Sequence, residues 1–241
     1  DVLGSRGLGD VYKRQECYVS PATISRFCRA LGYENYAHLK QECSSFASDS
    51  KKFNNLINVP LDMMKDKPQE CTKYYSDQVC DAISKLSQRL DWNVIDKVLQ
   101  AIHDSDSVAF FGTQFSHSAA LHFQTDLLML EKFTMAYMET ERQIDCARLM
   151  DENSVAIIVT VNGFYARSNS KVLQYLKKSK CKVVLMTNNP GIDIGINVNY
   201  TIVLGDSEQR KIGKHTLLTA VELMSLRYYS LYYPGIQEKI I

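Results

Sequence analysis

Residues 19–32 carry the side chains that a helix needs to read the major groove of DNA. Ser20 can accept hydrogen bonds from the free amides of a first turn, and Pro21 has no amide to leave unpaired there. Short hydroxyl side chains let a helix approach the bases, and arginine can form two hydrogen bonds with guanine. The amide dipoles at the same end of the helix favour phosphate. The candidate DNA-contacting residues are therefore Ser20, Thr23, Ser25, Arg26 and Arg29.

The same segment also fits an ordinary amphipathic helix at a protein surface. Ile24, Phe27, Cys28 and Leu31 recur at intervals of three and four, which predicts one buried stripe. Gly32 suits the left-handed position that follows a last helical turn. This periodicity is expected of both kinds of helix, so it does not decide between them.

Two polar segments, 112–118 and 160–165, follow predicted strands and combine hydroxyl groups with glycine. Hydroxyls and free backbone amides at such loops suit an anion such as phosphate, particularly where a helix begins. Polar loops with glycine are common after strands, so each segment is weak evidence by itself. The candidate ligand-binding residues are Gly112, Thr113, Gln114, Ser116, His117, Thr160, Asn162, Gly163, Tyr165 and Ser168.

The elements that must position these loops alternate between strand and helix. Short apolar runs predict strands over 107–111, 134–138, 154–160, 182–187 and 199–204. Helices are expected over 116–130, 141–150, 168–179 and 214–232, with Asp91 capping another before the first strand. Thr140 and Gln143 resemble a capping box. The alternation predicts a parallel sheet covered on both faces, and such sheets bind ligands at the carboxyl ends of their strands.

The first 90 residues lack this alternation. Residues 1–15 have no helical or strand periodicity, and we expect them to be foreign to the fold or a disordered leader. We assign 16–48 to a partial helix-turn-helix domain, in which Asn35 can cap a second helix. Residues 49–90 are expected to hold a linker and a connecting helix over 69–90, and 91–241 an effector-binding domain.

The composition excludes several classes of protein. Hydrophobic residues make up 45% and charged residues 23% of the 241 residues, which is ordinary for a globular chain. The net charge of +1 means that DNA binding must depend on a local basic patch. The seven cysteines are scattered and form no CxxC pair, so we expect reduced thiols in a cytoplasmic protein. We also expect no metal site and no cofactor. No apolar run is long enough to span a membrane.

The run 19–33, followed by Tyr36-Ala37-His38-Leu39-Lys40, resembles the recognition helix and the next helix of the RpiR family of bacterial transcription regulators. The order of elements over 91–232 is similar to the sugar isomerase (SIS) domain of the same family. Phe110-Phe111-Gly112, Asn162-Gly163 and Val184-Leu185-Met186-Thr187 carry that likeness. The implied fold class is α/β, a parallel-sheet SIS domain of flavodoxin-like sandwich form preceded by a partial all-α helix-turn-helix domain. The family's upstream helices have no counterpart here, which implies an N-terminal truncation.

The resemblance implies a DNA-binding regulator that senses a phosphosugar and binds its DNA operator as a homodimer or higher homo-oligomer. The loops depart from the family pattern at three positions. Asn162 and Tyr165 replace a usual serine and threonine, and Gln114 replaces a usual glycine. We expect the tyrosine side chain to intrude where phosphate normally lies.

Two other functions remain open. A catalytic phosphosugar isomerase would need a base and a ring-opening histidine, but no acidic or histidine residues form a local constellation with such spacing. A SIS module that assembles without a ligand is the other alternative. For the dimer, the helix 69–90 and the end of the closing helix offer apolar surface. The residues of that helix end are Tyr228, Tyr229, Leu231, Tyr232 and Tyr233.

Overall fold

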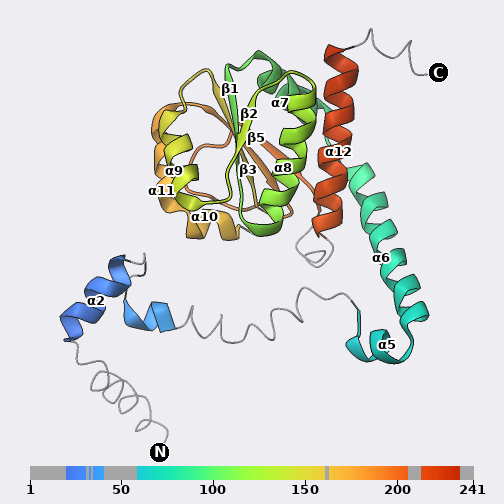
Figure 1. Cartoon of the computed structure of the whole chain (residues 1–241), viewed down its shortest axis with the longest axis horizontal. Helices are drawn as coiled ribbons and strands as arrows, with labels where there is room; N and C mark the ends of the chain where they lie inside the picture. The colour runs from blue at the N-terminus through green and yellow to red at the C-terminus, as the bar shows by residue number, and fades with distance from the viewer. Residues whose placement is uncertain are drawn as a thin grey trace, which may run out of the picture. The chain divides into compact units, whose positions relative to one another are not determined.

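The computed structural model describes residues 20–30, 33, 35–40, 59–160, 163–205 and 213–233. The chain divides into two compact units, 1–57 and 58–241, and the described elements of both are coloured in Figure 1. Leu31, Gly32 and Asn162 lie outside the described residues, as do 1–15, most of the helix expected up to residue 48, and most of the predicted linker.

In the first unit, helix α2 spans Pro21–Ala30. Ser20 caps it as expected, because its hydroxyl accepts a hydrogen bond from the Thr23 amide at 3.2 Å. Asn35 caps the helix over 36–40 in the same way, through the His38 amide at 2.9 Å. The predicted buried stripe is wrong at Phe27, which is 57% exposed, whereas Cys28 is buried. Among the described residues of this unit, no element packs over the Phe27 ring.

The second unit is built on one sheet whose five described strands are all parallel. Their spatial order is β2-β1-β3-β4-β5, which is the doubly wound, flavodoxin-like order. The predicted fold class is therefore confirmed for this unit. The strands are β1 (Ser107–Phe111), β2 (Thr134–Ala136), β3 (Ser154–Val159), β4 (Lys182–Thr187) and β5 (Tyr200–Val203).

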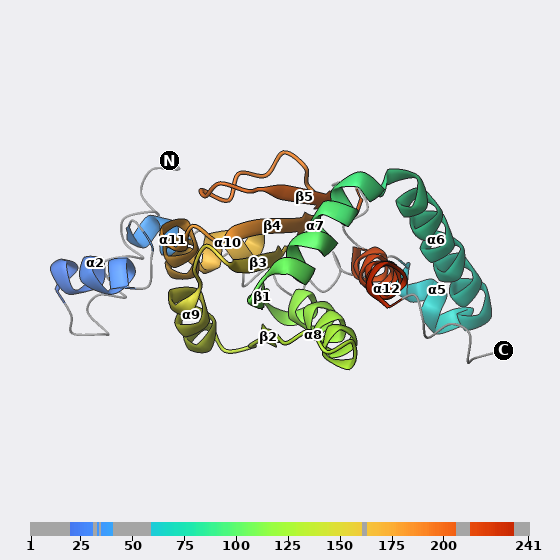
Figure 2. The same ribbon diagram turned by 90° about the horizontal axis from the view of Figure 1, so that it is seen from above.

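Helices cover both faces of the sheet, and Figure 2 shows the two layers on either side of it. Side chains of one strand alternate between two cores, so that Val108 and Phe110 pack in one and Ala109 and Phe111 in the other. The first core lies under α7 (Trp92–Asp104), α8 (Gln114–Met129) and α12 (Gly213–Tyr232). The second lies under α9 (Thr140–Leu149), α10 (Phe164–Ser168) and α11 (Ser170–Ser179).

Two helices precede the sheet. The short α5 (Leu61–Asp66) interrupts the predicted linker, and α6 (Pro68–Arg89) matches the expected connecting helix. Helix α6 packs along α12, and a 2.6 Å hydrogen bond joins the Tyr75 hydroxyl to Nε2 of His215. The connecting helix is therefore part of the second unit in this structure.

The tyrosines of α12 that we assigned to a dimer interface mostly make contacts within the unit. Tyr228 is buried and its hydroxyl lies 3.2 Å from Nδ1 of His103. Tyr232 stacks on the His103 ring, and the Tyr233 hydroxyl donates to the Leu130 carbonyl. Leu231, which we assigned to the same interface, is exposed, as are Leu218 and Leu226 on α12.

The predicted capping box of α9 is wrong. The N-cap is Glu139, which forms no side-chain cap bond, and Gln143 is buried in contacts with distant residues. Helix α10 was not predicted, and Ser168 ends it instead of beginning the next helix. No described helix is both long and apolar enough to cross a membrane.

Candidate functional site

The carboxyl ends of the parallel strands bring the two predicted ligand loops to one edge of the sheet. Strand β1 lies between β2 and β3. After β1 the next strand in the chain, β2, is added on one lateral side of β1, whereas the strands that follow β3 are added in the opposite direction along the sheet. This reversal is a topological switch point, where open α/β sheets bind their ligands. Gly112 follows β1 and Thr160 follows β3, so the predicted loops lie on the two sides of this point.

The loop after β1 fits closely against the first turn of α8. A Cβ atom on Gly112 would lie 3.2 Å from the backbone of Ser116 and His117, so glycine allows this approach. Thr113 is the N-cap but its side chain forms no cap bond. The first amides of a helix have no acceptor within it, and among the described residues no partner is recorded for those of Gln114 and Phe115. These groups can donate to an anion.

The loop after β3 is built around Gly163, which has a φ of 76° and begins α10. A Cβ atom there would lie 1.9 Å from the Ile192 side chain, so both conformation and space require glycine. Thr160 is buried and its hydroxyl accepts a hydrogen bond from the Tyr165 amide at 3.3 Å. Ser168 is exposed at the far end of α10. The position of Asn162, between these groups, lies outside the described residues.

Tyr165 does not enter the space between the loops, which corrects the expectation that its ring obstructs a phosphate site. Its side chain is 1% exposed and packs in the second core with Ile158 and Leu185. Its hydroxyl donates to Oε1 of Gln143 at 2.5 Å. Burial, with a smaller effect from Cys146, raises the pKa of the Tyr165 hydroxyl, which therefore stays protonated. Burying this large, mostly apolar ring in the second core is favourable, which explains its placement there.

Sequence reasoning missed Asn188, which follows β4 at the same edge of the sheet. Asn188 is fully buried, and among the described residues neither its side-chain nitrogen nor its oxygen has a hydrogen-bond partner. Buried amides are almost always paired, so an unpaired one calls for an explanation such as a ligand or an ordered water. The polar run Thr187-Asn188-Asn189 after a strand was the available signal.

His117 is the predicted residue with the most unusual surroundings. It is 6% exposed, and its Nδ1 atom has no hydrogen-bond partner in the part of the chain that the structure describes. Burial lowers the pKa of His117 below its ordinary value of 6.5, and the nearby Glu139 carboxylate opposes this shift. The ring is therefore neutral at neutral pH and can donate or accept a hydrogen bond at this edge.

The lowered pKa of His117 predicts a loss of stability in mild acid. Below pH 6.5 the unfolded chain binds a proton on this ring before the folded chain does, so the free energy of unfolding falls as the pH falls. His117→Gln, which cannot titrate, should flatten this dependence between pH 7.5 and 5. Urea unfolding at each pH measures the effect. Because burial also lowers the pKa of His215, part of the pH dependence of the free energy of unfolding should remain in this variant. An unchanged slope would contradict the assignment to His117.

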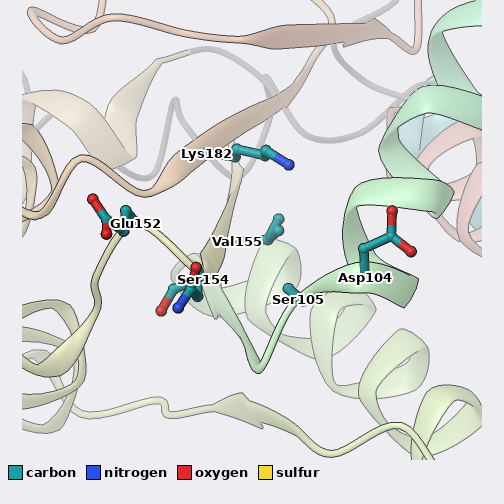
Figure 3. Close-up of a pocket in the computed structure, with 7 residues that line it drawn as sticks. Asp104, Ser105, Glu152, Ser154, Val155 and Lys182 are labelled. Atoms are coloured by element: carbon teal, nitrogen blue, oxygen red, sulfur yellow. The ribbon is translucent and has the colours of Figure 1, made fainter.

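A small pocket lies at the opposite edge of the sheet, away from these loops. It is lined at the start of β3 by Ser154 and Val155 and at the start of β4 by Lys182, as Figure 3 shows together with Asp104 and Glu152. Because it is at the amino ends of the strands, it is separate from the switch point. The described residues contain no group of three or more potential ligands that could hold a metal ion.

The exposed face of α2 carries the predicted DNA-contacting residues. Thr23, Ser25, Arg26 and Arg29 are all exposed, and within the described part of the chain neither arginine has a recorded salt bridge. Ser20 is used as the cap and also lies 3.0 Å from the Thr23 hydroxyl. The arginines are therefore the side chains that can extend furthest toward a partner.

Comparison with known proteins finds curated relatives that are HTH-type transcriptional regulators. No family model matches the chain. It is 25% identical over 174 residues to an uncharacterized HTH-type transcriptional regulator of Providencia stuartii, covering 72% of this chain and 60% of that protein. It is 24% identical over 150 residues to the HTH-type transcriptional regulator HexR of Pseudomonas aeruginosa, covering 62% of this chain and 51% of that protein. The chain thus spans about half to three fifths of these two relatives.

Solved structures share the fold. The Vibrio vulnificus NanR protein complexed with ManNAc-6P matches 93% of this chain and 80% of its own, with a TM-score of 0.62 and 15% identity. The sugar isomerase domain of an RpiR transcription factor from Sphaerobacter thermophilus matches 66% of this chain and 89% of its own, with a TM-score of 0.57 and 14% identity. The phosphoheptose isomerase GmhA of Neisseria gonorrhoeae matches 68% of this chain and 100% of its own, with a TM-score of 0.58 and 14% identity. The predicted likeness to SIS domains is confirmed for the fold.

Proposed function

We propose that this chain, which resembles HTH-type regulators in sequence and RpiR-type SIS domains in fold, is a DNA-binding transcription regulator that senses a phosphosugar. The observation that carries the proposal is the pairing of two features in one chain. One is a capped helix with exposed hydroxyl residues and arginines, and the other is a loop with free helix amides at the switch point of a SIS-type sheet. Both DNA and sugar phosphates are cytoplasmic partners, so we propose that the chain acts there.

In the sheet-containing unit, we propose that the phosphate is held by the first turn of α8. The amides of Gln114 and Phe115 and the hydroxyls of Thr113 and Ser116 have no recorded partner in the described chain and gather at one helix end. An anion gains from the partial positive charge of this end and from charge-assisted hydrogen bonds. His117, Asn188, Thr160 and Gly163 follow strands that end at this same edge, and we propose that they contact the sugar. Tyr165 packs in the second core, and its amide hydrogen-bonds Thr160.

Ser116→Ala should weaken phosphosugar binding, because it removes one hydroxyl donor to a charged group. The expected loss is about 1.5–3 kcal/mol. Isothermal titration of the full chain with ManNAc-6P, the ligand of the NanR structure, measures it, with inorganic phosphate as a second probe. Ser118→Ala is the matched control, since Ser118 is two residues further along α8 and its hydroxyl bonds the Gln114 carbonyl. Equal affinities for the two variants would contradict this anion site.

A catalytic isomerase is the second candidate function. The buried His117 beside Glu139 favours it, because a neutral histidine near a carboxylate can transfer protons. The similarity to phosphoheptose isomerase concerns the fold alone. We propose that the chain is not an enzyme, since its curated relatives are transcription regulators. Aldose–ketose interconversion of sugar phosphates, followed by NMR with this chain added, would overturn that view.

Palindromic operators are read by two-fold dimers, so we also propose a homodimer. The exposed leucines of α12, which are Leu218, Leu226 and Leu231, are the apolar surface available for it. Sedimentation of the chain at micromolar concentration should give the mass of a dimer, and Leu226→Lys should shift it toward the monomer. A native chain that sediments as a monomer would contradict the proposal.

A further inference from the structure

The side chain of Gln143 connects the ends of neighbouring strands from a helix outside both ligand loops. Its Nε2 group donates to the Gly112 carbonyl at 2.9 Å and to the Tyr137 carbonyl at 2.7 Å. Its Oε1 atom accepts from the Tyr165 hydroxyl at 2.5 Å. The side chain is 1% exposed. Gly112 follows β1 and Tyr137 follows β2, so one amide joins α9 to two strand ends and to α10.

Both hydrogen-bond donors of this amide and one of its two acceptor positions are used. An amide nitrogen has two hydrogens and an amide oxygen two lone pairs, and here both hydrogens and one lone pair have protein partners. Gln143 is therefore placed to hold protein groups and not to bind a ligand. Burial makes each of these bonds costly to break, because the freed carbonyl or hydroxyl would lose its partner without gaining water.

The bond to Gly112 also fixes the direction of the next amide. A trans peptide is planar, and its carbonyl and N–H point in opposite directions. Because the Gly112 carbonyl points to Gln143 on α9, the N–H of Thr113 must point away from α9. Thr113 is the N-cap of α8, the helix whose first amides we propose as the anion site.

Tyr165 makes the corresponding connection to the loop after β3. Its amide donates to the Thr160 hydroxyl at 3.3 Å, and its carbonyl accepts from Nδ2 of Asn169 at 3.1 Å. The Tyr165 hydroxyl then reaches Gln143. A continuous chain of buried hydrogen bonds thus runs from Thr160 through Tyr165 and Gln143 to Gly112, linking the two sides of the switch point.

We propose that Gln143 and Tyr165 are positioning residues that hold the loops after β1 and β3 in their ligand-binding arrangement before a ligand arrives. This inference rests on the proposed function for its ligand, and it assigns to these two residues a role through the loops and not through contact with the sugar. Loops that are already ordered lose less conformational freedom on binding, which strengthens affinity.

The test uses the full chain with Tyr165→Phe, which removes one hydroxyl and keeps the ring, and Gln143→Met, which removes both donors at similar volume. Amide hydrogen exchange of peptides covering 112–118 and 160–166 reports loop order without a ligand. Both variants should raise exchange in these peptides about tenfold, because one or two bonds that resist local opening are lost. Titration with ManNAc-6P should show affinity about three- to tenfold weaker. Saturating ManNAc-6P should restore native exchange, which a general loss of core packing would not allow.

Tyr228→Phe is the matched control, because Tyr228 is equally buried and loses only a hydroxyl bond to His103 in the other core. It should leave exchange in both loops and the affinity unchanged. The proposal is overturned if Tyr165→Phe leaves exchange in both loops at the native level, or if the control raises it equally. If the loops of Tyr165→Phe exchange faster but the native chain binds neither ManNAc-6P nor phosphate, the positioning role stands and phosphosugar sensing fails. If Gln143→Met does not fold, Tyr165→Phe alone decides.

Discussion

Tyr165→Thr should lower the free energy of unfolding of the sheet-containing unit by about 3–4 kcal/mol, since it deletes a buried aromatic ring and leaves a cavity. The ring packs among Ile158, Leu185 and their neighbours in the second core, and its hydroxyl bonds Gln143. Family resemblance alone led to the opposite expectation, in which threonine relieves an obstruction. The structure instead predicts that the family-like residue damages the fold.

Urea unfolding followed by the fluorescence of Trp92 measures this loss, because Trp92 is the only tryptophan of the chain and lies in α7 of the same unit. Tyr165→Phe is the matched control and should cost less, about 1–3 kcal/mol, because it keeps the ring and only leaves the buried Oε1 of Gln143 without its donor. If Tyr165→Thr unfolds at the native urea concentration, or binds phosphosugar more tightly than the native chain, the burial of this ring is not what holds the loop.

Arg26→Ala should weaken binding to a specific DNA site by about 1–3 kcal/mol if the guanidinium forms two hydrogen bonds with guanine. Arg26 is exposed on α2, beside the hydroxyls of Thr23 and Ser25. A duplex selected from a random pool by binding to the native chain supplies the specific site. Fluorescence anisotropy at fixed salt then measures affinity for that duplex and for an unrelated one.

The control for charge is Lys65→Ala, which removes one positive charge from α5 in the other unit. It should leave the specific affinity unchanged, whereas Arg26→Ala should reduce the preference for the selected duplex over the unrelated one. An equal loss on both duplexes would make Arg26 a phosphate contact. Native affinity for the selected duplex in Arg26→Ala would contradict the DNA-reading role of α2.

Much of the fold follows from local sequence. The predicted bounds of β1 and β4 agree with the structure, because short apolar runs between polar breaks limit where a buried strand can lie. The helix caps at Ser20, Asn35 and Asp91 also form as expected, since a cap needs only a side chain and amides two or three residues away. The alternation of strands and helices was enough to predict the parallel sheet and the edge that holds the two loops.

The sequence could not determine which side chains complete that edge. Thr140 and Gln143 have the spacing of a capping box, but Gln143 turns inward because carbonyls of Gly112 and Tyr137 and the Tyr165 hydroxyl lie within its reach. Tyr165 and Asn188 are ordinary loop residues by pattern, and both are buried. Contacts between residues 22 or 31 positions apart depend on how the strands are ordered and how the helices pack. Local periodicity carries no information about that arrangement, so only the tertiary structure decided these roles.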